Sequence, residues 1–509
     1  MFWQLLLVTA AVGAAYYHLS RRRLYRLARQ TPSGLKAYPI IGHAYLFTGS
    51  YEDLMLSLQK IGQTTYQHGG LASFWLANRL FVSMTNPTAI EVVAKACLDK
   101  DETTLRCTRM VIGNGLIFAP VNIWHRRRKI MAPFFALKNL HHIVPLFNEK
   151  SSIMVDLMRA EVGAGDFPIW KYMTTYSFDT VCETAAAHKM NSQEDPADRI
   201  FLDSINEGLE MVTKRVLLPW LHPDFIYKKL PVYKELMGHL RRAYDFIDEI
   251  VLEKRKQMAT NGIKDKNNNS SGLTNFLEMI IQTSGGLEKG YSNLEIREEA
   301  IVMIVAGNDT SAVGGSFTAV LLSRYPDVQA KVHQELDEVF GDSNRPVTPE
   351  DLPRLKYLEA VIKESLRLYP PVPIVAREVR SDVELPSGTT LVDGTSIMIH
   401  IWGTHRDPAY WGADAEEFRP ERFLEGPLRH PAMFIPFSYS IRGCIGGTYA
   451  MMSAKTALAN LLRRYRLLPP AGVRDEDLRR PLSVKYNIMM KASDDFLLRV
   501  QERKIKSHA

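Results

Sequence analysis

The chain has 509 residues, of which 46% are hydrophobic and 23% charged, and its basic side chains exceed its acidic ones by seven. A chain of this length and composition can bury a large core, which excludes the disordered and fibrous classes. The basic excess is mild and forms no stripe interleaved with aromatics, so nucleic acid is not an expected partner. Four widely spaced cysteines are too few for a disulfide scaffold and offer no CxxC zinc site, which favours a reducing compartment.

The first residues form an apolar run, Phe2 to Leu19, that only three polar side chains interrupt. About 17 to 25 such residues cross a bilayer as a helix. Five arginines follow the run and no basic residue precedes it, which orients the rest of the chain toward the cytosol. A cleaved secretory peptide and a mitochondrial presequence are both disfavoured, because each carries its positive charge before or within the apolar segment. Residues 1–20 are therefore expected to be a membrane anchor.

The residues after the anchor divide into a short linker and one large domain. Prolines and glycines interrupt residues 21–45, which predicts a basic, Pro/Gly-rich linker. Residues 46–509 show no internal repeat and are expected to form a single domain. Within it, Lys264 to Gly272 has a run of three asparagines and is typical of a low-complexity surface loop.

Most of this domain is typical of α-helix. A long helix is predicted from Ser292, where Glu295 completes a capping box, to the stop at Pro326. Another helix is expected over Tyr357 to Leu368, ahead of two prolines. Strand patterns are concentrated between Val372 and His400. The predicted fold is mainly α with a small β region.

Cys444 has a glycine on each side of it and precedes a segment, 448–462, that favours helix. A thiolate at the start of a helix is stabilised by the helix dipole and by free backbone N–H groups, which lower the thiol pKa. The glycines let a flat cofactor approach the backbone, and Arg442 can pair with a carboxylate at the cofactor's rim. A lone cysteine is more often a buried structural residue, so the neighbouring residues carry the interpretation of a ligand or nucleophile.

This segment resembles the haem-binding signature of the cytochrome P450 superfamily, Phe-x-x-Gly-x-Arg-x-Cys-x-Gly. The fixed positions that match are Phe437, Arg442, Cys444 and Gly446. Ser440 stands where the signature has glycine, so this serine must accept the same turn geometry. The longer stretch Phe434 to Lys455 is similar to the family-4 clan of insects and vertebrates. The resemblance implies the cytochrome P450 fold, with a single large haem-binding domain and Cys444 as the axial ligand of the haem iron.

The hexapeptide from Ala306 to Ser311 places a glycine and several polar groups inside the long apolar helix. A mid-helix glycine costs about 1 kcal/mol, and buried polar groups cost more unless paired, so a locally opened helix beside a cavity is expected. Taken alone, the hexapeptide is more typical of a harmless kink or a helix contact. It resembles the oxygen-activation motif of the family, which implies that Thr310 hydrogen-bonds the dioxygen being activated and that Asp309 delivers protons. Ala306 replaces the glutamate that esterifies the haem in many family-4 members, which implies a non-covalent haem b (iron protoporphyrin IX).

Three further residues resemble propionate-binding positions of the family. Trp124 and Arg128 lie four apart on one face of a predicted helix, and this spacing matches the family's Trp-x-x-x-Arg pair. Arg377 matches another propionate-binding arginine. The neighbouring Arg126, Arg127 and Lys129 are expected to form a solvated basic face, part of which can dock an acidic electron donor.

Glu364 and Arg367 lie three apart on a predicted helix and can pair on its surface. Together with Arg422, they resemble the family's buried ionic triad near the cysteine loop. The role implied for the triad is folding and haem retention, because removing one member leaves a buried charge unpaired at a cost of about 3 to 5 kcal/mol.

The resemblance implies a monooxygenase that inserts one atom of O2 into a C–H or C=C bond of a hydrophobic substrate. No Gly-x-Gly-x-x-Gly segment follows a predicted strand, so electrons are expected from NADPH through a separate NADPH–cytochrome reductase, with cytochrome b5 as a further candidate partner. Apolar residues at 116–118, 304–305 and 374–375 are expected to line the pocket. They suit a fatty acid, a long-chain hydrocarbon, an isoprenoid or a xenobiotic.

The expected location is the endoplasmic reticulum membrane, with the catalytic domain facing the cytosol. Two alternatives remain open: a haem-thiolate isomerase or dehydratase that acts on peroxides, and a haem or lipid carrier that kept the fold without catalysis. Asp309 and Thr310 argue against the first, because peroxide isomerases have no use for a proton-delivering pair.

Overall fold

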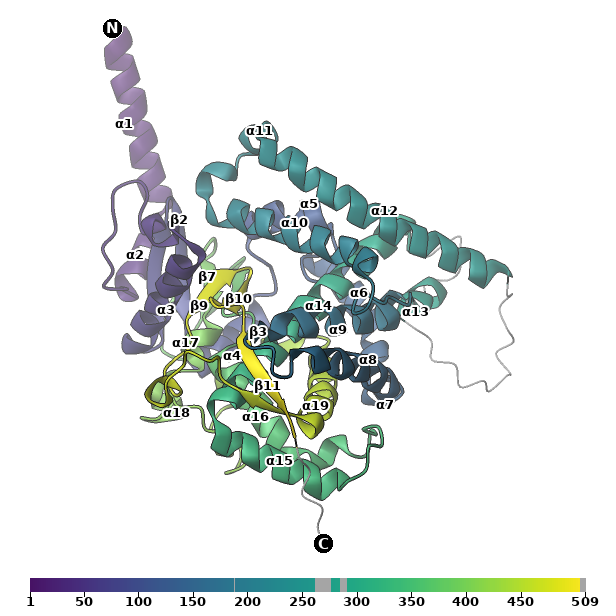
Figure 1. Ribbon diagram of the computed structural model, residues 1–509. Helices are drawn as coiled ribbons and strands as arrows, with labels where there is room; N and C mark the ends of the chain where they lie inside the picture. Colours follow the sequence, from purple (N-terminus) through teal and green to yellow (C-terminus); the bar gives the residue numbers. More distant parts are fainter. Residues whose placement is uncertain (187, 261–275, 284–290, 504–509) are drawn as a thin grey trace.

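The computed structural model describes residues 1–186, 188–260, 276–283 and 291–503 (Figure 1). The loop predicted at Lys264 to Gly272 lies outside the described residues. Helix α1 (Phe2–Ser20) projects away from the body, and its described side chains are exposed. In the described part of the chain, it is the one helix long and apolar enough to cross a membrane.

The segment predicted as a linker is folded onto the body. It contains helix α2 (Arg22–Gln30), whose Leu27 is buried in a cluster with residues of the nearby sheet. The carbonyl of Thr31 accepts a hydrogen bond of 2.7 Å from the backbone N–H of Ser73. The chain after α1 therefore leads directly into packed structure.

The body is mainly helical, which confirms the predicted fold class. Its longer helices are α3 (Tyr51–Gln67), α4 (Pro87–Ala96), α5 (Glu102–Ile112), α6 (Val121–Met131), α8 (Val144–Leu157), α9 (Ile169–Val181), α10 (Arg199–Leu217), α12 (Pro231–Thr260), α13 (Phe276–Thr283), α14 (Asn293–Arg324), α15 (Pro326–Phe340), α16 (Lys356–Leu368) and α19 (Gly447–Arg464). Its short helices are α7 (Leu137–His141), α11 (Asp224–Tyr227), α17 (Ile401–Thr404) and α18 (Pro408–Trp411).

Helix α14 is the central element, and it packs against α9, α12, α16 and α19 (Figure 1). It begins with the predicted capping box, in which Ser292 and Glu295 exchange side-chain to backbone hydrogen bonds. It ends at Arg324, directly before Tyr325 and Pro326, as predicted. Because it is surrounded by other helices, most of its side chains are buried, and it can present residues to a site on more than one side.

The strands form small sheets beside the helices. A four-stranded sheet has the order β1 (Leu71–Leu76), β2 (Arg79–Met84), β7 (Ser396–Ile399) and β4 (Val375–Glu378). The remaining pairings join β5 (Val383–Glu384) to β6 (Thr390–Leu391), β9 (Val484–Asn487) to β10 (Met489–Ala492), and β11 (Leu497–Glu502) to both β3 (Phe167–Pro168) and β8 (Tyr465–Leu468).

The strand prediction covered only part of this structure. Strands β4 to β7 lie between Val372 and His400, as expected, but β1 to β3 and β8 to β11 lie outside that range. Strands β1 and β2 are short and largely apolar, and periodicity cannot distinguish such runs from buried helix. Strand β1 pairs with β2, and β2 pairs with β7 across a long stretch of sequence, so tertiary contacts help to decide their conformation.

Candidate functional site

Cys444 lies in a tight loop just before α19. Its backbone N–H donates to the carbonyl of Phe437 at 2.8 Å, and the ring of Phe437 packs against Gly447, where an added Cβ would lie 3.4 Å from it. Of the four cysteines, Cys97, Cys107 and Cys182 are buried and Cys444 alone is exposed. The loop therefore presents one sulfur atom to open space at the start of a helix.

The pKa of Cys444 is raised, contrary to the sequence expectation that the helix start would lower it. Protein atoms enclose the sulfur on all but its open side, and the resulting desolvation exceeds the opposing effects of the Gly446 N–H and the Arg128 guanidinium. The chain alone does not make this thiol a strong nucleophile. A bound metal ion would supply the missing stabilisation, because a coordinating thiol is deprotonated outright.

Ser440 has φ 62° and Ser438 has φ 61°, so both lie in the left-handed region that favours glycine. The turn is closed by a 2.9 Å hydrogen bond from the N–H of Gly443 to the carbonyl of Ser440. A Cβ on Gly443 would lie 3.0 Å from that carbonyl oxygen. Ser440 thus adopts the geometry that the family signature assigns to glycine, as predicted.

Two arginines and a tryptophan adjoin this loop. The guanidinium of Arg442 lies 4.4 Å from the ring centroid of Trp124. Arg128, on the same helix as Trp124, donates from Nη1 to the carbonyl of Gly443 at 2.8 Å. The structure therefore brings together three of the residues predicted to contact the cofactor's rim.

Arg377, on β4, completes what we call the Arg442 cluster: Arg128, Arg377 and Arg442. Arg377 is 1% exposed and its Nε has no hydrogen-bond partner. Burial lowers the pKa of Arg377 to about 10, and burial together with the charges of Arg377 and Arg128 lowers the pKa of Arg442 to about 10. Within the described residues, none of the three guanidinium groups forms an ion pair. Buried cations without anions are costly, so the cluster is incomplete without a negatively charged ligand.

Lys100 is a fourth basic residue near this cluster, and sequence analysis missed it. Burial, and then the charges of Arg377 and Arg442, lower the pKa of Lys100 far below its usual value. In the sequence it stands among alternating charges, Asp99-Lys100-Asp101, a pattern that is more typical of a solvated surface. No sequence signal distinguishes it from a surface lysine.

Helix α14 continues through Ala306 to Ser311 without interruption, so the predicted local opening is wrong. Gly307 allows α9 to approach closely, since an added Cβ would lie 3.0 Å from Val181. The hydroxyl of Ser177 on α9 donates to the carbonyls of Gly307 and Asn308 at 3.3 and 3.1 Å. Thr310 donates to the carbonyl of Ala306 at 2.6 Å. Contacts to α9 and to the helix backbone therefore replace the expected opening.

Asp309 is 4% exposed and is paired with Lys491 of β10, whose Nζ lies 3.1 Å from Oδ1. Lys491 also lies 4.9 Å from the ring centroid of Trp170. The side of α14 that carries Asp309 borders a small cavity between α9, α10 and α14, lined in part by Phe178, Phe201, Ile205, Leu209, Ile304 and Val305. Sequence reasoning missed Lys491, because nothing in a strand near the C-terminus indicates a partner on α14.

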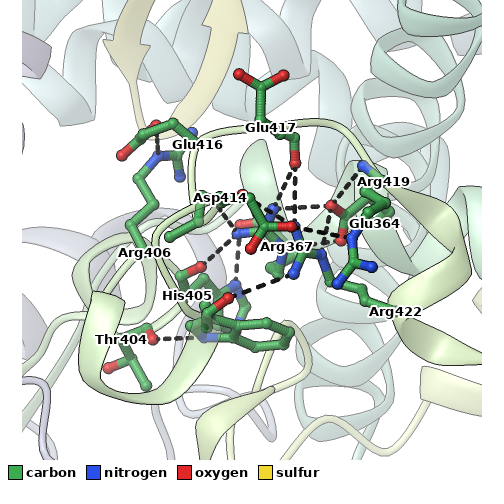
Figure 2. A network of polar contacts seen from close by, with 12 residues as sticks. Glu364, Arg367, Thr404, His405, Arg406, Asp414, Glu416, Glu417, Arg419 and Arg422 are labelled. Atoms are coloured by element: carbon green, nitrogen blue, oxygen red, sulfur yellow. Dashed lines mark hydrogen bonds and ion pairs between the residues drawn. The ribbon is translucent and has the colours of Figure 1, made fainter. Parts of the chain in front are cut away.

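A second charged group, the Glu364 cluster, consists of Glu364, Arg367 and Arg422. Figure 2 shows the Glu364 carboxylate receiving both arginines. Arg367 donates from Nε and Nη2 at 2.7 and 2.8 Å, and Arg422 donates from Nε at 2.9 Å. Glu364 and Arg367 are fully buried and Arg422 nearly so, which confirms the predicted buried triad.

The prediction of a solvated basic face on α6 is wrong for Arg127. Arg126 and Lys129 are exposed, but Arg127 is 2% exposed and lies 2.6 Å from the carboxylate of Glu299 on α14. Successive helical residues point about 100° apart, so a run of basic residues cannot all face solvent when the helix packs on one side.

Comparison with known proteins identifies the family. Residues 32–494 match the Cytochrome P450 family model. The chain belongs to the cytochrome P450 family. It is 30% identical to human cytochrome P450 4V2, with 95% of this chain and 92% of the relative covered. It is also 32% identical to cytochrome P450 4d2 of Drosophila melanogaster and 31% identical to cytochrome P450 4c21 of Blattella germanica, each over more than nine-tenths of both chains.

These matches confirm the predicted resemblance to family 4 and identify the chain as a cytochrome P450 monooxygenase. The family implies a haem, and the residues of this cytochrome P450 fit one. The unpartnered Nε of Arg377 and the missing anions of the Arg442 cluster suit the two carboxylates of a haem. The exposed sulfur of Cys444 suits its iron. Helix α1 and the family-4 relatives suggest a membrane-bound protein.

Proposed function

We propose that this cytochrome P450 hydroxylates or epoxidises a hydrophobic substrate, using a non-covalent haem b whose iron the Cys444 sulfur would hold. The observation that carries the proposal is the exposed Cys444 sulfur in a loop bordered by the buried Arg377 and Arg442 and the partly buried Arg128, none of which has a carboxylate partner among the described residues. When bound, the haem supplies the oxygen-activating chemistry, and thiolate ligation favours cleavage of the O–O bond.

The Arg442 cluster holds the haem propionates in this proposal. Arg442 and Arg128 approach from the cysteine loop and from α6, and Arg377 approaches from β4. Trp124 supports the guanidinium of Arg442 through its ring. Phe437 anchors the loop by packing against Gly447. Lys100 lies in the same region, where burial and the charges of Arg377 and Arg442 lower its pKa.

Asp309 and Thr310 move protons. Asp309 pairs with Lys491 at 3.1 Å, on the side of α14 that borders a small cavity. Thr310 is the next residue on the helix, and its hydroxyl donates a hydrogen bond to the carbonyl of Ala306. Asp309 accepts protons from the solvent side, and Thr310 passes them into the site.

The apolar side chains of the proposed pocket indicate the substrate class. Ile304 and Val305 line the cavity beside Asp309, and residues 116–118 and 374–375 are proposed to extend an apolar pocket. Such a pocket suits a fatty acid, a long-chain hydrocarbon, an isoprenoid or a xenobiotic.

Exposed Arg126 and Lys129 offer a docking surface for an NADPH-dependent reductase or cytochrome b5. Helix α1 would anchor the enzyme in the endoplasmic reticulum, with the body in the cytosol.

The decisive experiment is the absorption spectrum of the reduced, CO-bound protein. We expect a red-shifted Soret band of the thiolate type, which disappears in Cys444→Ala because the sulfur ligand is lost. Cys182→Ala is the matched control, since it removes a buried sulfur and should retain the band. A haem held through nitrogen in the unaltered protein would overturn the proposal.

Coupling of NADPH consumption to product tests the proton path and the competing functions. Thr310→Ala should lower the product formed per NADPH, while Thr310→Ser, which keeps the hydroxyl, should preserve it. Unchanged coupling in Thr310→Ala would remove the proton role. An isomerase would form product without NADPH, and a carrier would form none.

A further inference from the structure

Arg127 lies next to Arg128 in the sequence. The side chain of Arg128 contacts the cysteine loop, whereas the side chain of Arg127 contacts α14. Its Nη1 lies 2.6 Å from Oε1 of Glu299, and the two side chains are 2% and 0% exposed. Glu295 and Glu298 also approach Arg127, at the longer distances of 3.3 and 3.4 Å. Glu299 is thus the principal counter-ion of a buried arginine that the haem site does not use.

The other carboxylate oxygen of Glu299 holds the backbone of residues 113–120, which we call the α5–α6 segment. Oε2 accepts a 3.0 Å hydrogen bond from the N–H of Leu116. Arg127 donates to the carbonyl of Asn114 in the same segment, at 2.6 Å. The pair therefore binds this segment at two neighbouring points of its backbone.

The α5–α6 segment packs directly against α14. A Cβ added to Gly113 would lie 2.1 Å from the carboxylate of Glu298, and one added to Gly115 would lie 2.3 Å from Val302. Gly113 also has φ 54°, in the left-handed region. The glycines permit a close backbone approach, which brings the Leu116 N–H within reach of a helix side chain.

On its opposite side, the same segment holds Arg442. Nη1 of Arg442 donates to the carbonyl of Leu116 at 3.4 Å, and Nη2 donates to the carbonyl of Ala119 at 2.8 Å. Nε donates to the carbonyl of Leu98 at 3.2 Å. Two of the three contacts that orient this guanidinium therefore come from the segment that Glu299 holds.

We propose that Glu299 is a positioning residue for the haem site: it fixes the α5–α6 segment through the Leu116 N–H, and the carbonyls of that segment fix Arg442. The inference rests on the proposed function in one respect, namely that Arg442 contacts a haem propionate. A purely structural Glu299 would stabilise the fold through Arg127 without affecting how Arg442 binds its ligand.

The test compares Glu299→Gln and Glu299→Leu with Glu298→Gln in the full-length, haem-loaded protein. Glu298 is the matched control, because it is adjacent on α14 and near Arg127 but does not bond the segment. Two quantities are measured: amide hydrogen exchange of peptides covering residues 113–120, and the rate of haem loss. In Glu299→Leu we expect exchange and haem loss each to rise about tenfold, since a charge-assisted hydrogen bond is removed. Glu298→Gln should change neither.

A double-mutant cycle with Arg442→Gln separates positioning from general stabilisation. If Glu299 acts through Arg442, Glu299→Leu adds little further haem loss when Arg442 is already replaced. An equal, independent increase in that background would overturn the inference, as would unchanged exchange at residues 113–120 in Glu299→Leu. If Glu299→Leu does not fold, Glu299→Gln provides the same comparison, because it keeps the shape but weakens both contacts. A CO spectrum without thiolate character in the unaltered protein would instead reject the proposed function.

Discussion

The two buried arginine groups of this protein differ in where their anions come from. In the Glu364 cluster, one carboxylate of the chain receives both Arg367 and Arg422 (Figure 2). In the Arg442 cluster, Arg377 and Arg442 are buried and Arg128 is partly buried, and the described chain offers the three groups only neutral hydrogen-bond acceptors. Burial alone therefore does not reveal the role of an arginine. A cluster that the chain neutralises by itself supports the fold, whereas a cluster that lacks anions is built to bind them.

The largest expected effect comes from removing the carboxylate of the Glu364 cluster. We expect Glu364→Gln to lower the free energy of unfolding by about 3 to 5 kcal/mol, because the buried Arg367 loses its carboxylate partner and Arg422 keeps only Asp414, at 3.3 Å. Denaturant unfolding of the variant and the unaltered protein measures the change. Glu417→Gln is the control, since Glu417 contributes only its backbone carbonyl to Arg367 and its side chain is exposed. An effect below 1 kcal/mol would mean that the cluster is not a folding element.

Acid should weaken the Glu364 cluster through His405. The ring of His405 is buried: Nε2 accepts from the N–H of Ile435 at 2.8 Å, and Nδ1 lies 3.1 Å from the carbonyl of Arg367. Burial and the nearby Arg367 lower the pKa of His405 to about 3, from an unfolded value of 6.5. The unfolded chain binds this proton first, so the stability contribution is complete above pH 6.5 and is lost progressively as the pH falls toward 3.

At pH 5 the loss from His405 amounts to about 2 kcal/mol. Unfolding free energies at pH 7.5 and pH 5 measure it, and the difference between the two should be about 2 kcal/mol smaller in His405→Gln than in the unaltered protein. An identical pH dependence in both proteins would show that the ring does not stay neutral in the fold.

In contrast to the Glu364 cluster, the Arg442 cluster should not lose stability in the haem-free protein when one of its charges is removed. We expect Arg377→Met to leave the haem-free protein at least as stable as before, because a buried cation with an unpartnered Nε is removed. Haem binding should weaken about tenfold, since a charge-assisted contact to a propionate is lost. Unfolding with and without haem, together with haem titration, separates the two effects. Destabilisation of the haem-free protein would place Arg377 with the structural arginines.

Sequence patterns predicted these two clusters unequally. The three-residue spacing of Glu364 and Arg367 and the cysteine signature sufficed to predict the triad, the cysteine loop and Trp124 with Arg128. They could not show that Arg127 is buried, since a run of basic residues is usually a solvated face. The same limit applies to Lys100, Lys491 and Glu299, whose partners are distant in sequence.

The helix and strand predictions were correct where local signals decide the structure and wrong where distant contacts decide it. The capping box and proline stop fixed both ends of α14, because those signals are local. The predicted opening at Gly307 did not occur, because Ser177 on another helix supplies the hydroxyl that satisfies the carbonyls there. Strands β1 and β2 were missed because their short apolar runs carry no distinctive pattern, and the pairing of β2 with the distant β7 helps to determine them.

The smallest predicted effect concerns the loop that presents Cys444 to the Arg442 cluster. Ser440 has φ 62°, which costs a residue with a Cβ about 1 kcal/mol relative to glycine. Ser440→Gly should therefore raise the free energy of unfolding by up to about 1 kcal/mol, while Ser440→Ala should not, because alanine has the same conformational penalty. Haem affinity should stay within about twofold in Ser440→Gly, since the carbonyl that closes the turn is kept. A larger gain in haem affinity would show that strain in the turn, as well as the charges of the Arg442 cluster, limits binding.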